Sequence, residues 1–197
     1  MSDPVQNPYL SPTAASAAAT ESTGTLLTTL RTNQIIAIAL IQGVLLITAI
    51  LAFMTLRSAP NANPAPVAMP AGAGDLVLPL MGAVLGAGSL VASMLVSKIM
   101  RQASINRFIA SKENVPRPID ENITMTPAIR KLVGAASATR IVALAILEGA
   151  AVFNAILMLL DGYLALHLAV ITVCIFAMGV RFPTLRKRLD LIEEVAS

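Results

Sequence analysis

Four long apolar runs constrain this chain more than any other feature of its sequence. Each is close to the roughly 17–25 residues that a helix needs to cross about 30 Å of hydrocarbon at about 1.5 Å per residue. Buried helices of a soluble bundle are the alternative, but such helices carry polar residues at helical spacing on one face, and these runs do not. The sequence therefore predicts an all-α membrane protein with four transmembrane helices. The runs are residues 35–56, 76–97, 141–160 and 163–180.

The composition points the same way. Hydrophobic residues make up 56% of the chain and charged residues 13%, which leaves too little polar surface to cover a water-soluble globule. We therefore expect the lipid bilayer to be the main surroundings of the protein. Because Cys174 and His167 are the single cysteine and histidine, an internal disulfide, a cysteine-based metal site and a bis-histidine haem within one chain are excluded. We expect no cofactor and no metal.

The positions of the basic residues predict the orientation in the membrane. Of the 14 Lys and Arg residues, 13 lie before the first run, between the second and third runs, or after the fourth, and Arg57 is the exception. Cytoplasmic segments of membrane proteins carry such an excess. We expect a multi-pass protein of the inner (plasma) membrane with both termini in the cytoplasm. No basic segment is interleaved with stacking aromatic residues, so we expect no nucleic-acid partner.

The chain divides into five segments. The first is rich in Ser, Thr and Ala and has little apolar surface to bury, so we expect it to be disordered. Thr126-Pro127 predicts a helix start, with Thr as the cap and Pro in the first turn, that continues into the third run. The segments are a disordered arm (1–30), a first helical hairpin (31–111), a cytoplasmic linker (112–126), a second helical hairpin (127–180) and an amphipathic cytoplasmic tail (181–197).

The first and third runs align without gaps at an offset of 106 residues, and the alignment places Gln42-Gly43 opposite Glu148-Gly149. A matched polar–glycine step is harder to obtain by chance than matched apolar residues. We interpret it as a duplicated helical hairpin, with the two copies related by an axis along the membrane normal.

Three polar residues fall at a similar depth in the predicted spans. Glu148 is the eighth residue of its span and thus about 10 Å from the cytoplasmic end, Gln42 is the eighth residue of the first span, and Ser89 lies at a comparable depth. A carboxyl at this depth is costly and normally faces protein or water. Two interpretations stay open: a Glu148–Gln42 hydrogen bond that pins the hairpins together, with Ser89 as the next candidate partner, or a proton or cation site.

A second polar pair, Asn154 and His167, is predicted near the other end of the third and fourth spans. We interpret it as a hydrogen-bonded pair, since one His without a nearby carboxylate is a poor metal site. Asp161 is a candidate partner within reach of His167, but it is expected to mark the aqueous turn between these spans.

The tail follows Pro183, which is expected to end the fourth helix. Its apolar residues recur at near-helical spacing beside Arg186, Lys187 and Arg188. This pattern is typical of an amphipathic helix on an anionic lipid surface, where those three residues are the membrane-surface basic group. A helix that docks on a partner is the alternative.

The segment ALAILEGAAVFNAILMLL (143–160), followed by RFPT (181–184), resembles a group of small, uncharacterised four-span bacterial membrane proteins. These have a Leu-Glu-Gly-Ala step in a span and a Phe-Pro-Thr step after the last one. The resemblance covers roughly residues 126–194 and implies no activity. The glycine-rich stretch 82–88 together with Glu148 is also similar, locally, to the proteolipid subunits of rotary ATPases, although the connecting loop is far longer here.

These patterns predict an integral membrane protein of structural or accessory type that assembles with itself or with a membrane-protein partner. The alternative is a component of proton- or cation-coupled transport that uses Glu148. We expect no enzymatic activity and name no catalytic residue, since the spans carry a single carboxyl without a second acidic partner.

Overall fold

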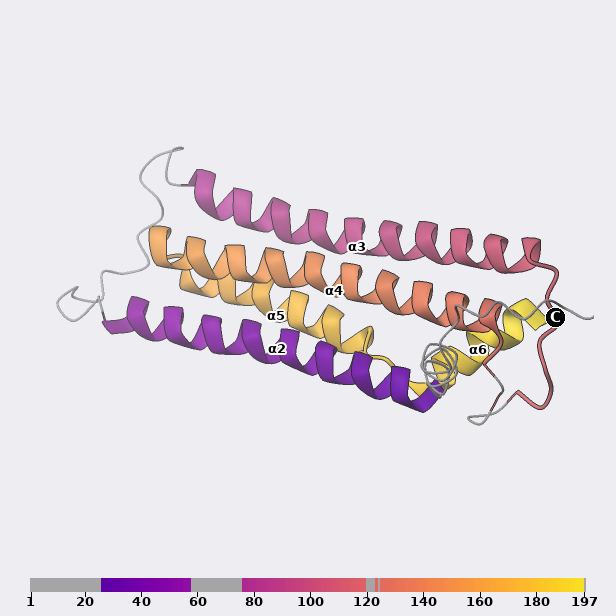
Figure 1. Ribbon diagram of the computed structural model, residues 1–197. Coiled ribbons are helices and arrows are strands. Elements are labelled where there is room, and N and C mark those ends of the chain that lie inside the picture. Colours follow the sequence, from indigo (N-terminus) through magenta and orange to yellow (C-terminus); the bar gives the residue numbers. More distant parts are fainter. Residues whose placement is uncertain (1–25, 58–75, 120–122, 124, 197) are drawn as a thin grey trace, which may run out of the picture.

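Five α-helices make up the described part of the chain, which comprises residues 26–57, 76–119, 123 and 125–196 of a computed structural model. No strand occurs among these residues. Successive helices from α2 to α5 run in opposite directions along the long axis of the molecule, and the short last helix lies at one end (Figure 1). They are α2 (Leu26–Arg57), α3 (Val77–Ala110), α4 (Pro127–Asp161), α5 (Leu164–Val180) and α6 (Leu185–Ala196).

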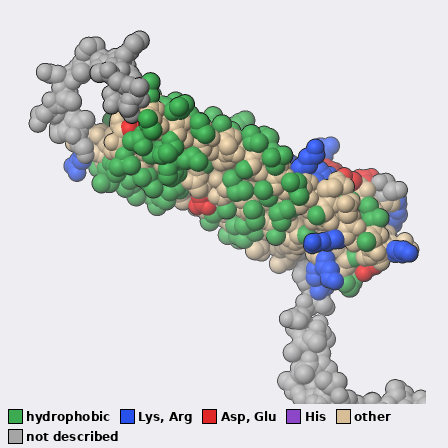
Figure 2. Space-filling model, turned by 90° about the horizontal axis from the view of Figure 1, so that it is seen from above, with side chains coloured by type: hydrophobic (Ala, Val, Ile, Leu, Met, Phe, Trp, Pro, Cys, Tyr) green, Lys and Arg blue, Asp and Glu red, His purple; other side chains and the backbone are tan. Residues whose placement is uncertain are grey.

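Three of these helices, α2, α3 and α4, are long and apolar enough to cross a membrane. A fourth crossing is reached if α5 and α6, which meet at a bend of 59°, count as one broken span. Large hydrophobic side chains are exposed along this bundle, among them Ile35, Phe53, Leu80 and Phe176. They form a broad apolar band, and Lys and Arg gather mainly at one end of it (Figure 2). The architecture is thus that of an all-helical, multi-pass membrane protein.

The ends of α4 are set by local sequence. Thr126 accepts a hydrogen bond from the Ile129 amide at 3.3 Å, and Pro127 occupies the first turn. This confirms the predicted helix start and its continuation into the third apolar run. At the other end Gly162 adopts a left-handed φ of 74°, which a residue without Cβ does at little cost, and its amide donates to Met158 O at 3.3 Å. The chain reverses there into α5.

One predicted boundary needs correction. Residues 26–30, which the composition predicts as part of the disordered arm, are the first residues of α2, and Leu26 and Leu30 are buried there. Their apolar side chains have a core to enter, which the composition of the arm did not reveal. The rest of the arm and residues 58–75 lie outside the described residues. Pro183 does separate α5 from α6, as predicted.

Helix α4 is the centre of the bundle and packs against α2, α3 and α5, while α3 also packs against α5. Helices α2 and α3, the two arms of the predicted first hairpin, are not among the closely packed pairs, whereas α4 and α5 are. The first hairpin is therefore not a packed unit like the second. Its helices lie on different sides of α4 (Figure 1). The likeness between the first and third runs does not extend to equivalent packing.

A compact core lies at the basic end of the molecule. Side chains from the start of α2, the end of α3, the linker, the start of α4 and α6 meet there, and Ile129 and Ile192 are fully buried. The apolar face of α6 is thus used inside the chain. The other buried members are Leu26, Ile105, Phe108, Ile123, Ala128, Leu132, Val133 and Leu191.

Candidate functional site

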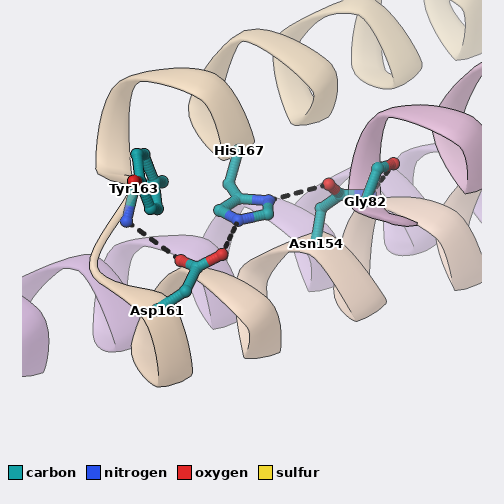
Figure 3. A network of polar contacts seen from close by, with 5 residues as sticks. All are labelled: Gly82, Asn154, Asp161, Tyr163 and His167. Atoms are coloured by element: carbon teal, nitrogen blue, oxygen red, sulfur yellow. Dashed lines mark hydrogen bonds and ion pairs between the residues drawn. The ribbon is translucent and has the colours of Figure 1, made fainter. Parts of the chain in front are cut away.

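A buried polar network joins α3, α4 and α5 at the end of the bundle opposite α6. Asn154 comes from α4 and His167 from α5, and both are 0% exposed. His167 Nδ1 lies 3.0 Å from Asn154 Oδ1, and His167 Nε2 lies 2.8 Å from Asp161 Oδ2 (Figure 3). The structure therefore brings the predicted pair together and adds a third member.

The hydrogen bonds of Asn154 assign the proton on one of the two nitrogens of His167. The Asn154 amide nitrogen donates to Gly82 O at 3.2 Å and to Ala150 O at 2.9 Å. Because carbonyls only accept, these bonds assign Asn154 Oδ1 as an acceptor, so His167 Nδ1 must carry a proton. One further proton then lies between His167 Nε2 and Asp161, either on the imidazole as an ion pair or on the carboxyl.

Asp161 does more than mark the turn. One carboxylate oxygen accepts from the Tyr163 amide at 2.9 Å, while the other faces His167 (Figure 3). Its side chain is only 5% exposed, so the carboxyl is buried against α5 and is within reach of His167. Because the chain reverses at Gly162, the Asp161 carboxyl lies against the first turn of α5. The signal was present in the sequence, since an acidic residue at a C-terminal turn lies close to the first turn of the next helix.

Two glycines let α3 approach this network. A Cβ at Gly82 would lie 2.6 Å from Asn154 Oδ1 and 2.8 Å from His167 Cε1, and one at Gly86 would lie 2.4 Å from Val170 Cγ1. Such distances cannot accommodate a side chain. Close packing through small residues is a common way for membrane helices to associate. The backbone of α3 thus covers one side of the network, and the network holds three helices together.

Glu148, Gln42 and Ser89 do not form one cluster. Glu148 is half-buried on α4, with its Oε1 3.8 Å from the position of a Cβ on Gly43 of α2. Gln42 is exposed, and no hydrogen bond joins it to Glu148 in the described part of the chain. Successive helical residues are turned by about 100°, so α2 presents Gly43 to α4 and directs Gln42 away. The expected direct Glu148–Gln42 bond is therefore corrected.

Ser89 is buried, and no hydrogen bond joins it to Glu148 among the described residues. Its hydroxyl donates to Gly86 O at 2.7 Å, within its own helix, and lies beside the Cys174 thiol of α5. Ser89 thus belongs to the α3–α5 contact.

The three basic residues of the tail have different positions. Arg186 and Lys187 are exposed, and Lys187 Nζ donates to Val180 O at 2.8 Å. Arg188 is only 5% exposed, so its assignment to the membrane surface is wrong. The spacing held a signal that was overlooked: residue 188 lies three after Leu185 and four before Ile192, on the apolar face of α6.

Arg188 takes part in a second buried network, which sequence reasoning missed. Its Nη2 donates to Ser137 Oγ at 3.2 Å and contacts Thr29 O at 3.4 Å. Asn33 of α2 donates to the same Ser137 Oγ at 2.7 Å. Burial, together with the nearby Arg140 guanidinium, lowers the pKa of Arg188 to about 10. This network ties α2, α4 and α6 together at the basic end.

No three His, Cys, Asp or Glu side chains meet as a metal-binding group among the residues that the structure describes. Comparisons of the chain with protein-family models, with curated proteins and with solved structures find no match. Function is therefore inferred from the residues themselves.

Proposed function

We propose that this chain is a four-span integral protein of the inner membrane, of structural or accessory type, that assembles with a second copy or a membrane-protein partner through the face formed by α2 and α4. The observation that carries the proposal is the Glu148 carboxyl. It lies in mid-helix, half-buried on an apolar bundle, and no hydrogen bond from the described residues satisfies it.

A carboxyl in hydrocarbon is costly unless another polar group reaches it. Within the chain its near neighbour is the Gly43 backbone, and glycine offers no side-chain donor. A second protein molecule would supply the hydrogen-bond partner that Glu148 lacks within the described chain. The exposed Gln42 amide is the complementary group, because an amide can donate to a carboxylate or accept from a carboxylic acid. In a symmetric interface between two copies, Gln42 of each copy would bind Glu148 of the other, so the contact would form twice.

The proposed orientation places both termini in the cytoplasm. It is supported by the charge distribution, because 13 of the 14 Lys and Arg residues lie before the first apolar run, between the second and third runs, or after the fourth. The first residues of α2 and α4 and the last residues of α3 lie at the same end as α6 (Figure 1). A single basic end agrees with the excess expected on the cytoplasmic side.

The experiment is a measurement of oligomeric state for the purified full chain in detergent and in liposomes, by single-molecule photobleaching. Glu148→Leu removes the polar contact and is expected to shift the population to monomer. Glu148→Gln retains hydrogen bonding and is expected to remain associated. Glu193→Leu is the matched control, since Glu193 is an exposed acid of α6 outside the spans. A parent protein that is monomeric alone and co-purifies with no membrane protein would contradict the proposal.

The alternative function is proton- or cation-coupled transport centred on Glu148. The same observation favours it, because a carboxyl without an internal partner can bind and release a proton. It is distinguished by flux through liposomes loaded with a pH-sensitive dye. Transport requires flux in the parent protein that Glu148→Gln abolishes while assembly persists.

A further inference from the structure

A cavity of about 390 Å³ opens at the basic end of the bundle, between α3, α4, the end of α5 and α6. Its size is within the range of small-molecule sites. Four basic side chains line it, and Asp190 is the acidic residue of the lining. The basic residues are Arg101, Arg140, Arg181 and Lys187.

The cavity lies at the level where the apolar runs end. Ser97 is the last residue of the second run, Arg140 immediately precedes the third, and Arg181 immediately follows the fourth. Ala143 and Val180 form apolar parts of the wall. For helices that cross a bilayer, this is the level of the lipid phosphates, where basic side chains gather.

Two of the lining guanidinium groups are not neutralised within the described part of the chain. Arg140 and Arg181 form no ion pair there, and Nη1 of Arg181 is buried without a hydrogen-bond partner. Burial lowers the pKa of both residues, although an arginine remains protonated at neutral pH. Both residues are half-buried, and withdrawing an unpaired charge from water is costly, so this cluster favours binding of an anion.

The other basic residues of the wall are partly engaged. Arg101 pairs with Glu194, and Lys187 donates to backbone carbonyls of Val180 and Phe182. The Ser97 hydroxyl donates to its own helix, at Ser93 O. The donors left for a ligand are therefore chiefly those of Arg140 and Arg181.

Arg188 adds positive charge behind this wall. It lines a smaller adjoining space together with Arg140 and Lys187, and its buried Nη1 has no partner in the described chain. Three guanidinium groups thus converge from α4, the turn after α5, and α6.

We propose that this cavity binds the phosphate group of an anionic ligand, held mainly by Arg140 and Arg181. A guanidinium presents paired N–H donors that match two phosphate oxygens, and such charge-assisted bonds are about twice as strong as neutral ones. The phosphate belongs either to the headgroup of an anionic phospholipid or to a soluble phosphate compound. The inference does not depend on assembly through Glu148.

The test uses the purified full chain in detergent micelles, with phosphatidylglycerol, phosphatidylcholine or sodium phosphate added at constant ionic strength. Thermal unfolding gives the shift in Tm with ligand concentration. Phosphatidylglycerol is expected to stabilise the parent protein more than phosphatidylcholine. Arg181→Gln and Arg140→Gln are each expected to weaken the apparent affinity about tenfold.

Arg186→Gln is the matched control, because it removes one exposed positive charge of α6 that does not line the cavity, and it should leave the affinity unchanged. Arg181→Lys retains the charge without the planar fork and serves if a Gln variant fails to fold; it too should bind more weakly.

Stabilisation by phosphatidylglycerol alone identifies a lipid phosphate, and stabilisation by sodium phosphate as well identifies a soluble one. The proposal is overturned if Arg186→Gln weakens binding as much as Arg181→Gln, if phosphatidylcholine stabilises the parent equally, or if no additive stabilises it.

Discussion

His167 Nε2 lies 2.8 Å from Asp161 Oδ2, and the two side chains are 0% and 5% exposed. The residues are six apart, and the reversal at Gly162 brings the end of α4 against the first turn of α5. On its other side the same imidazole donates to Asn154, whose amide reaches the backbone of α3. One local turn is thus connected to the packing of three helices.

The His167–Asp161 pair is expected to act as a unit in stability. Asp161→Ala and His167→Ala should each lower the free energy of unfolding by about 2–3 kcal/mol, because each leaves the other buried side chain without its hydrogen-bond partner. The double variant should cost at least about 1 kcal/mol less than the sum of the two. Unfolding in mixed detergent micelles measures all four proteins. Strict additivity would show that the contact carries no coupling energy.

Gly82 should tolerate no side chain. Gly82→Ala places a Cβ 2.6 Å from Asn154 Oδ1 and 2.8 Å from His167 Cε1, so we expect a loss of about 1–3 kcal/mol through forced displacement of the network. Gly88→Ala on the same helix meets no atom within 4 Å and should be neutral or stabilising by up to about 1 kcal/mol. The same unfolding assay compares them. Equal effects at the two sites would contradict the packing of α3 described above.

Much of the helical architecture could be predicted from the sequence because it depends on local signals. Apolar runs of sufficient length located the helices, Thr126-Pro127 located the start of α4, and Pro183 located the break before α6. Each signal acts within a few residues of the feature it determines, so no knowledge of neighbouring helices was needed.

Lateral packing could not be predicted in the same way. Helices that are apolar on every side show no preferred face, and small residues occur on several of them. Nothing in the composition of α2 and α3 shows that α4 lies between them. Whether Gln42 or its neighbour Gly43 faces α4 depends on how α2 is rotated about its axis, and the sequence of α2 does not show this rotation. The cluster formed by Arg140, Arg181 and Arg188 required three segments to converge.

Arg188→Met should stabilise the protein at neutral pH in phosphate-free buffer. Arg188 is 5% exposed and its Nη1 has no partner among the described residues. A charged group buried in this way costs free energy that an apolar side chain of similar length does not, so we expect a gain of about 1 kcal/mol. Arg188→Ala should instead destabilise, because it leaves a cavity. Ser137 retains its bond to Val133 O at 2.7 Å in both variants.

The pH dependence of stability gives a second measure of the same residue. The pKa of Arg188 is lowered to about 10 in the folded protein, so above that pH the unfolded chain binds more protons than the folded one. Its contribution to stability therefore rises as pH increases from about 10 towards the ordinary pKa of arginine. Arg188→Met should flatten this rise. A loss of stability in Arg188→Met at pH 7 would show that the polar contacts outweigh the burial of charge.

The proposed membrane orientation predicts which side each end of the bundle faces. In a Cys174→Ala background, Arg57→Cys at the end of α2 should react with a membrane-impermeant maleimide on intact cells. Arg186→Cys on α6 should react only after permeabilisation. Both positions are exposed, and Cys174 is buried, so reactivity reports the side of the membrane. The expected pattern follows from the basic residues, since positively charged segments are retained in the cytoplasm. Labelling of Arg186→Cys but not Arg57→Cys on intact cells would show that the orientation is reversed. Labelling of both would show that the two positions lie on the same side of the membrane, which the proposed number of spans does not allow.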